Sequence, residues 1–339
     1  MVKASRPPAN GLVAVLRRLY NPLGFSKGYN FALFFVLAGA LLGFSLARLP
    51  YLDYFGTFRS AKATEASYFR PGAARVGMML HLFTIIPASV LVVLQFVPAI
   101  RHRAVLVHRL NGYLVVLLAL VGTAGALAAA RHAMGGTLEV QTGVGFLAVV
   151  FVGELALAWV NVRRLQIDQH RAWMLRAWVL AGAILTSRLC LVPMMFINAP
   201  AGYATVRTCD QIDFEHDADR PAVLAHFPGC AGFYGGAGVN GSGPAGPRLS
   251  VVVPADPSKG GLSGLGSSLT FNFGAAIWLA MAIHMIGVEI YLRLTPAESE
   301  RLRNISYQRQ IEAGMKNPGS AGLTADRLGD AAKWTPASD

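Results

Sequence analysis

The sequence predicts an all-α integral membrane protein, a bundle of six transmembrane helices with a long extracytosolic loop between helices five and six. Two observations carry this prediction besides the six apolar stretches themselves. Charged residues make up 14% of the 339 residues, against about 25% in an average soluble domain. The mean hydropathy is +0.45. So few charges cannot cover the surface of a water-soluble protein of this length.

Each apolar stretch is long enough to cross a bilayer, which takes about 20 residues in a helix. A transmembrane domain is therefore predicted over residues 29–293, preceded by a cytosolic segment, residues 1–28. This segment is basic and has no small-residue cleavage pattern, so the first span is predicted to be an uncleaved signal anchor. The predicted spans are 29–49, 76–100, 108–130, 140–162, 172–197 and 270–292.

The net charge of +12 is interpreted as membrane orientation and not as nucleic-acid binding, because the basic residues gather at the ends of the spans. Short loops rich in arginine stay in the cytosol. Two loops have this composition, and both termini are accordingly predicted to be cytosolic. The protein is predicted to lie in a membrane of the secretory pathway or in the plasma membrane. The arginines are Arg101, Arg103 and Arg109 in one loop and Arg163, Arg164 and Arg171 in the other.

The outer loop, residues 198–269, contains two signals of an oxidising compartment. Cys209 and Cys230 are predicted to form a disulfide. Asn240-Gly241-Ser242 is a glycosylation sequon, and Asn240 is predicted to carry a glycan. Both signals agree with an extracytosolic position for this loop.

A cytosolic helix is predicted over residues 294–314, after the last span. Thr295-Pro296-Ala297-Glu298 has the pattern of a capping box with proline in the first turn. Residues 315–339 show little apolar periodicity and are predicted to form a disordered tail.

Ionisable residues within the spans are the candidate functional residues, because charge inside a membrane is costly and is usually retained for function. An inner layer is predicted from Glu154, Arg176 and His284, in which Glu154 and His284 are the candidate catalytic pair. An outer layer is predicted from His81 and Arg188. Helix-register roles for these charges remain open.

Two predicted helices begin with the same dipeptide at the membrane surface, His108-Arg109 and His170-Arg171. Imidazoles on neighbouring helices are typical axial ligands of haem b, so His108 and His170 are candidate metal ligands. Arginines suit the haem propionates. The wider set of candidate cofactor-binding residues is His81, His108, His170, Arg109, Arg171, Arg176 and Arg188. Interfacial anchoring is the alternative interpretation of the two dipeptides.

The same motifs carry a family resemblance. His81, His108-Arg109-x-x-Gly112-Tyr113 and His170-Arg171-x-Trp173-Met174-x-Arg176 resemble the membrane proteins grouped as domain of unknown function 2306, found in bacteria and filamentous fungi. The resemblance covers about residues 75–195, and the outer loop and the helix after Thr295 look like fungal additions. Asn111 and Ala177 depart from the pattern. The family implies a fold and candidate positions, but no reaction.

Several functions remain open at this level. The leading hypothesis is a membrane oxidoreductase that holds haem b and acts on a lipophilic substrate or an electron-transfer partner. The alternatives are a cofactor-free membrane enzyme of lipophilic metabolite biosynthesis that uses Glu154 and His284, a transporter, or a scaffold. Membrane lipid is an expected partner in each case, and nucleic acid in none. No soluble-cofactor motif such as a P-loop or a His-Glu-x-x-His zinc motif is present.

Overall fold

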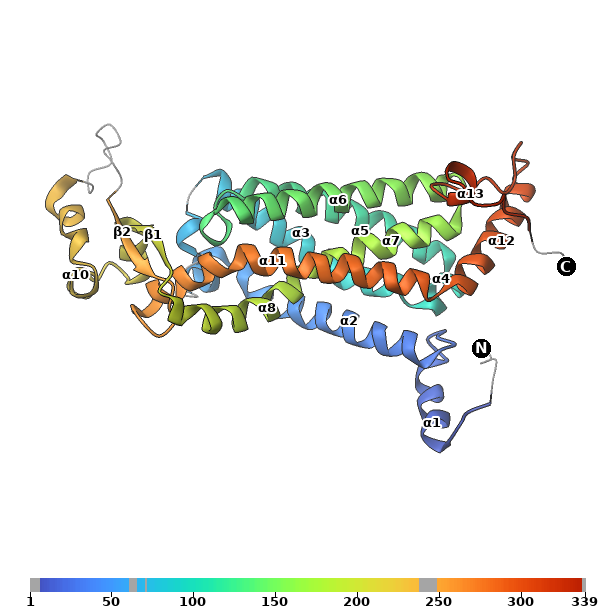
Figure 1. Ribbon diagram of the computed structural model, residues 1–339, viewed down its shortest axis with the longest axis horizontal. Coiled ribbons are helices and arrows are strands. Elements are labelled where there is room, and N and C mark those ends of the chain that lie inside the picture. Colours follow the sequence, from blue (N-terminus) through green and yellow to red (C-terminus); the bar gives the residue numbers. More distant parts are fainter. Residues whose placement is uncertain (1–6, 61–65, 71, 238–248, 337–339) are drawn as a thin grey trace. The chain divides into compact units, whose positions relative to one another are not determined.

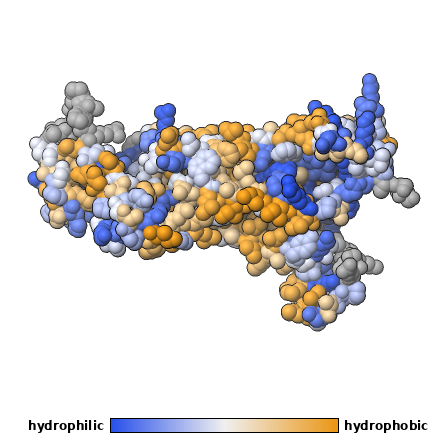
Figure 2. All heavy atoms as spheres, in the orientation of Figure 1, coloured by the Kyte–Doolittle hydropathy of each residue, from blue (hydrophilic) through white to orange (hydrophobic). Residues whose placement is uncertain are grey.

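The computed structural model describes residues 7–60, 66–70, 72–237 and 249–336, and these are mostly helical (Figure 1). Six helical segments are long and apolar enough to cross a membrane, which confirms the predicted all-α integral membrane protein. The six segments are Gly28–Leu46, Ala73–Gln95, Val105–Ala129, Leu138–Arg163, Ile167–Ala201 and Gly261–Arg293. Figure 2 shows hydrophobic residues exposed along the long helices, as expected of a surface that faces lipid.

The helices are labelled in chain order. They are α1 Gly11–Tyr20, α2 Gly28–Leu46, α3 Ala73–Gln95, α4 Pro98–Arg103, α5 Val105–Ala129, α6 Leu138–Arg163, α7 Ile167–Ala181, α8 Ala183–Asn198, α9 Cys209–Glu215, α10 Arg220–His226, α11 Gly261–Arg293, α12 Pro296–Glu312 and α13 Ala325–Leu328. Two strands, β1 Ala204–Thr208 and β2 Ser250–Pro254, form an antiparallel pair in which Val206 lies opposite Val252.

The sixth span begins nine residues before the predicted start at 270, because α11 already begins at Gly261. Its first turns contain buried serines that lower the hydropathy of this stretch. Ser267 donates a hydrogen bond of 2.8 Å to the carbonyl of Val253, and Ser263 bonds the Glu215 carboxylate at 2.9 Å. Polar residues with partners of this kind can be buried in a helix that a hydropathy scan ends early.

The fifth span is two helices, α7 and α8, separated at Gly182. Helical hydrogen bonding resumes after the break, where the amides of Leu185 and Thr186 donate to the carbonyl of Gly182 at 3.0 and 3.4 Å. The apolar stretch 172–197 predicts one continuous helix, and the break at Gly182 is not predicted from it.

The chain divides into two compact units, one of residues 1–144 with 188–276 and the other of residues 145–187 with 277–339. In the first unit, α3 and α5 approach each other through glycines. A Cβ atom at Gly125 would lie 2.7 Å from the backbone nitrogen of His81, and one at Gly77 would lie 2.9 Å from the carbonyl of Gly125. Only glycine permits backbones this close, as in other small-residue contacts between membrane helices.

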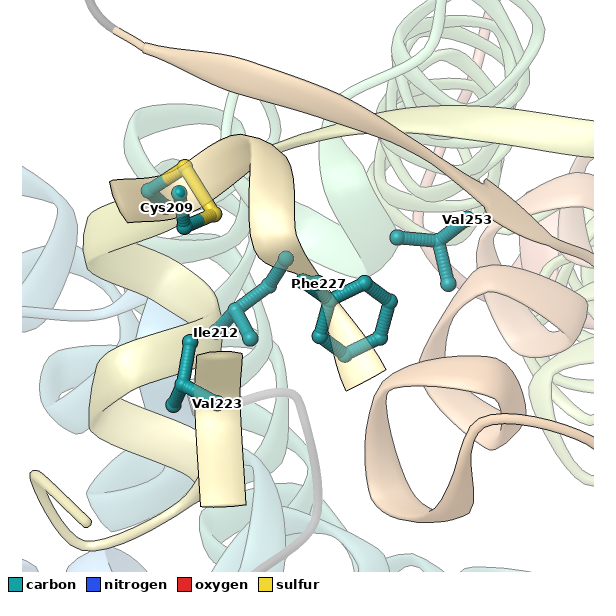
Figure 3. Packing of buried hydrophobic residues seen from close by; sticks show 6 residues of the cluster. Cys209, Ile212, Val223, Phe227 and Val253 are labelled. Carbon is teal, nitrogen blue, oxygen red and sulfur yellow. A yellow bond between two sulfur atoms is a disulfide. The ribbon is translucent and has the colours of Figure 1, made fainter. Parts of the chain in front are cut away.

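The outer loop forms a small module with its own core, also in the first unit. The predicted disulfide between Cys209 and Cys230 is present and connects α9 to the segment after α10. Figure 3 shows the bonded cysteines beside apolar side chains of α9, α10 and β2, which are buried together. These are Ile212, Val223, Phe227 and Val253. The predicted glycosylation site, Asn240, lies outside the described residues.

The C-terminal segment of the second unit packs against the start of α7. Ser306 of α12 accepts a hydrogen bond of 2.9 Å from the amide of Ile167. The residues after α12, predicted to be a disordered tail, are placed as far as residue 336 and include α13. Their backbone is bound by amide side chains, since Gln166 and Gln310 both donate to the carbonyl of Ser320, at 2.8 and 3.2 Å.

The predicted capping box before α12 is wrong. Thr295 does occupy the N-cap position, but its side chain makes no capping hydrogen bond. The hydroxyl instead donates 3.0 Å back to the carbonyl of Tyr291 in α11. The preceding span ends at Arg293, only two residues earlier, and its last carbonyls compete for this hydroxyl.

Candidate functional site

An ion pair between two spans is the centre of the candidate site in the second unit. Arg176 of α7 donates through Nε to one oxygen of Glu289 in α11 at 2.6 Å, and through Nη2 to the other at 3.2 Å. The guanidinium also lies over the ring of Trp173, 4.6 Å from its centroid. A bidentate arginine–carboxylate pair of this kind fixes geometry as well as charge.

Glu154 of α6 is the second acid of this site. Its side chain is half-buried, and among the residues that the structure describes, its buried Oε2 atom accepts no hydrogen bond. The charges of Arg176 and Glu289 both act on it. The site therefore holds two carboxylates and one guanidinium, and the guanidinium is already bonded to Glu289. Glu154 is left with an acceptor available for a proton or a ligand.

His284 of α11 lies at the break in the fifth span. Its Nδ1 donates to the carbonyl of Val179 at 2.5 Å, since a carbonyl can only accept, and its Nε2 lies 2.7 Å from the hydroxyl of Thr186. A Cβ atom at Gly182 would lie 3.1 Å from the imidazole Cε1 and 3.1 Å from the carbonyl of Val179. Glycine at the break therefore makes room for the imidazole that bonds α7 on one side and α8 on the other.

The predicted inner layer is therefore only partly brought together. The charge of Arg176 acts on Glu154, which places these two side chains in one electrostatic environment. The carbonyl of Val179 and the hydroxyl of Thr186 bond both ring nitrogens of His284, and within the described residues no hydrogen bond joins His284 to Glu154. In the part of the chain that the structure describes, no hydrogen bond therefore supports the predicted Glu154–His284 pair.

Sequence analysis misses Glu289, the partner of Arg176. The signal was present, because Glu289 is an acid inside the predicted span 270–292, five residues after His284. It lies near the end of an apolar stretch and is easily taken for an interfacial residue. Thr186 is missed for another reason, since a hydroxyl in a span is usually satisfied by its own helix.

The residues of the predicted outer layer have separate partners in the first unit. His81 of α3 donates through Nδ1 to the carbonyl of Gly122 in α5 at 2.8 Å. The guanidinium of Arg188 lies over the ring of Phe273, 4.7 Å from its centroid. A role for His81 in joining α3 to α5 accounts for this contact.

The two His-Arg dipeptides are placed at the starts of α5 and α7. His108 is half-buried in the first unit, and Arg109 beside it is exposed. In the second unit His170 donates through Nδ1 to the carbonyl of Ala158 at 3.0 Å, while Arg171 lies over the ring of Tyr291 at 5.8 Å.

These positions bear on haem binding. The Nδ1 bond of His170 to the carbonyl of Ala158 holds the imidazole ring in one orientation, as is common in metal-ligating histidines. The residue fits an axial ligand in this respect. His81 and His108 cannot share one iron, because His81 bonds the α5 backbone at Gly122. Gly122 is fourteen residues beyond His108, about 21 Å along a helix at 1.5 Å per residue.

Six spans with ionisable groups between them define the class, an integral multi-pass membrane protein. The family model described as "Predicted membrane protein (DUF2306)" matches residues 78–209. The match runs from α3 to the start of α9, and the resemblance drawn from the His-Arg motifs is confirmed.

A fungal relative extends the similarity beyond that domain. The chain is 23% identical over 341 residues to "Ava biosynthesis cluster protein G" of Aspergillus versicolor, an alignment that covers 87% of this chain and 97% of the relative. No solved structure matches the chain.

Proposed function

We propose that this protein is a membrane enzyme that transfers a proton to or from a lipophilic small molecule in a biosynthetic pathway, with Glu154 as the acid–base group. The observation that carries the proposal is the buried Oε2 atom of Glu154, which accepts no hydrogen bond within the described residues and lies beside an arginine–glutamate pair. The name of the fungal relative, a biosynthesis cluster protein, supports the pathway context.

The three side chains have distinct roles in this proposal. Protonated Glu154 gives its proton to the substrate, so that its O–H bond breaks as a new bond to hydrogen forms on the substrate. The carboxylate that remains is stabilised by the positive charge of Arg176. Glu289 holds Arg176 through two hydrogen bonds. A proton lost from another position of the substrate restores Glu154, and no oxidant is consumed.

His284 has a positioning role in the same proposal. Its two bonds, to Val179 and Thr186, connect both sides of the break at Gly182. Since Arg176 lies six residues before the break on α7, these bonds help to fix the helix that presents the guanidinium.

The test is a chemical comparison of strains of the source organism. Deletion of the gene should make one lipid-soluble compound accumulate, and membranes with the wild-type protein should convert that compound. Glu154→Gln should lower this rate by about 10²–10⁴-fold, the usual contribution of a general acid or base. The matched control is Glu139→Gln, a glutamate in the first turn of the same helix that is exposed.

Two outcomes would contradict the proposed enzymatic function. Conversion by Glu154→Gln at the wild-type rate, with equal protein in the membranes, would remove the acid–base role. A compound that no membrane converts, but that is redistributed across the membrane in the deletion strain, would indicate a carrier. The break at Gly182 resembles the discontinuous helices that carriers use.

A haem-binding oxidoreductase is a second candidate, favoured by one contact. The Nδ1 bond of His170 to the carbonyl of Ala158 orients the imidazole ring as in many metal-ligating histidines. Bound haem would supply electron transfer, and Arg171 is placed next to this histidine. The protein purified in detergent should then show a Soret band that His170→Ala removes and His132→Ala, at an exposed histidine, retains. A colourless, folded protein would contradict this candidate.

A further inference from the structure

The short helix α1 has an uncovered apolar face. Leucine and valine side chains recur at positions i, i+3, i+4 and i+7, a spacing that places them on one side of a helix. Leu12, Val15, Leu16 and Leu19 have 69%, 55%, 42% and 62% of their surfaces exposed. In Figure 2 this helix carries a cluster of hydrophobic side chains at the surface. Such a continuous apolar stripe on a ten-residue helix is typical of a docking surface.

Basic residues lie beside this face. Arg17 and Arg18 occupy the last turn of α1, and no acidic residue lies in its first turn. Lys27 follows just before α2 begins. Apolar side chains on one side and arginines next to them are the composition of helices that lie in the interface of a membrane.

Aromatic packing holds α1 at the beginning of the first span. Tyr20, the last residue of α1, is 5% exposed and stacks on Phe31 of α2 with ring centroids 5.6 Å apart. Phe25, in the connection, packs on Phe31 at 5.6 Å and on Phe34 at 5.2 Å. Figure 1 shows α1 turning away from the direction of α2 instead of continuing it. This packing therefore fixes α1 at an angle to the first span.

We propose that α1 is an interfacial anchor that docks on anionic lipid in the leaflet where α2 begins. Its apolar face lies at the boundary between headgroups and acyl chains, and Arg17 and Arg18 contact lipid phosphates. The exposed surface of the neighbouring span α2 is also apolar and includes Leu33 and Val36. Lipid is favoured over a second copy of the chain, since four aliphatic side chains offer less than the roughly 800 Å² per partner of a stable interface.

The experiment places a fluorescent probe on either side of α1 in the full-length protein. Cys190, the cysteine outside the disulfide, is first replaced by alanine. A probe is then attached at Leu16→Cys on the apolar face or at Ala14→Cys on the opposite side, which is the matched control. Each protein is reconstituted in phosphatidylcholine vesicles with and without phosphatidylserine. Quenching is measured with brominated lipid and with aqueous iodide.

The probe at residue 16 should be quenched by brominated lipid and protected from iodide, and the probe at residue 14 should show the reverse. Phosphatidylserine should increase the difference between them, and Arg17→Glu with Arg18→Glu should abolish that increase. Equal access of iodide to both probes would overturn the proposal. If the unlabelled Leu16→Cys protein forms a disulfide between two copies on oxidation, and the probe at residue 16 does not respond to brominated lipid, α1 makes a dimer contact and the proposal is overturned as well.

Discussion

Two arginine–glutamate pairs of the same chemistry lie in very different surroundings. In the outer module, Arg207 bonds Glu215, and both side chains are 2% exposed. Both carboxylate oxygens of Glu215 are occupied, since Ser263 donates to the second one at 2.9 Å. In the membrane spans, Arg176 and Glu289 are 22% and 47% exposed. We call Arg207–Glu215 the sealed pair, because it is buried, and Arg176–Glu289 the open pair, because it is partly exposed.

The difference indicates which pair is structural. A sealed pair with both acceptor oxygens filled has no room for a substrate, and it fixes the fold of the module around it. The open pair lies beside Glu154, whose buried Oε2 accepts no hydrogen bond within the described residues. The proposed chemistry is therefore assigned to the site in the spans, although both pairs are short arginine–carboxylate contacts. The predictions below rank the consequences of this difference.

The largest effect is expected in the sealed pair. Arg207→Met leaves Glu215 as a buried charge without its partner, and should cost about 3–5 kcal/mol of unfolding free energy. The measurement is chemical unfolding of the detergent-solubilised protein. Arg207→Met combined with Glu215→Leu is the control and should recover most of the loss, because an apolar pair avoids the buried charge. If Arg207→Met alone were as stable as the wild type, the sealed pair would not be structural.

Removal of the disulfide comes next. Cys209→Ser with Cys230→Ser should destabilise the outer module by about 3 kcal/mol, the value for a closed loop of this length in the chain-entropy model. The bridge joins residues 21 positions apart. Protease digestion of the intact protein should cut the module faster in this variant, while conversion of substrate by the spans persists. If protease resistance of the module and conversion of substrate were both lost, the outer module and the site in the spans would not be independent of each other.

The open pair should contribute much less to stability. Glu289→Gln should change the unfolding free energy by about 1 kcal/mol or less, the range of polar contacts between membrane helices. Glu215→Gln in the sealed pair is the matched substitution and should cost more. The same chemical unfolding measurement compares them. Equal losses for the two would mean that exposure does not separate the pairs.

The smallest effect concerns a third pair, Arg303 with Asp326, which joins α12 to α13 at 2.5 Å. The hydrogen bond from Arg303 lowers the pKa of the Asp326 carboxyl to about 2, from an ordinary value of about 3.9. A lowered pKa in the folded state stabilises at pH above the ordinary value, and this stabilisation is lost as the pH falls through the folded value. Docking of the C-terminal segment should therefore weaken between about pH 4 and pH 2.

Digestion by pepsin across that range measures this weakening. Cleavage after α12 should accelerate toward pH 2 in the wild type, and Asp326→Asn should already be cut fast at pH 4. A wild-type rate that stays flat over this range would show that the pair does not hold the segment.

The sequence alone predicted the six spans to within a few residues at most ends, because apolar length is a local property. It also predicted the disulfide, since Cys209 and Cys230 lie in one loop that was predicted to face an oxidising compartment. The family domain was recognisable from His170-Arg171-x-Trp173 and the related motifs. The early start of α11 at Gly261 was not, because its serines look polar until the carbonyl of Val253 is seen to accept from Ser267.

Partners across helices were decided only in the tertiary structure. The sequence offers Glu154 and Glu289 equally as acids for Arg176, and nothing local distinguishes them. Which one forms the pair depends on the faces that α6, α7 and α11 turn toward one another, and the bidentate bond is made with Glu289. The break at Gly182 was also decided only in the tertiary structure, since glycines are common within spans and do not by themselves predict a break. Only the tertiary structure shows that Gly182 leaves space for His284, which bonds Val179 and Thr186 on the two sides of the break.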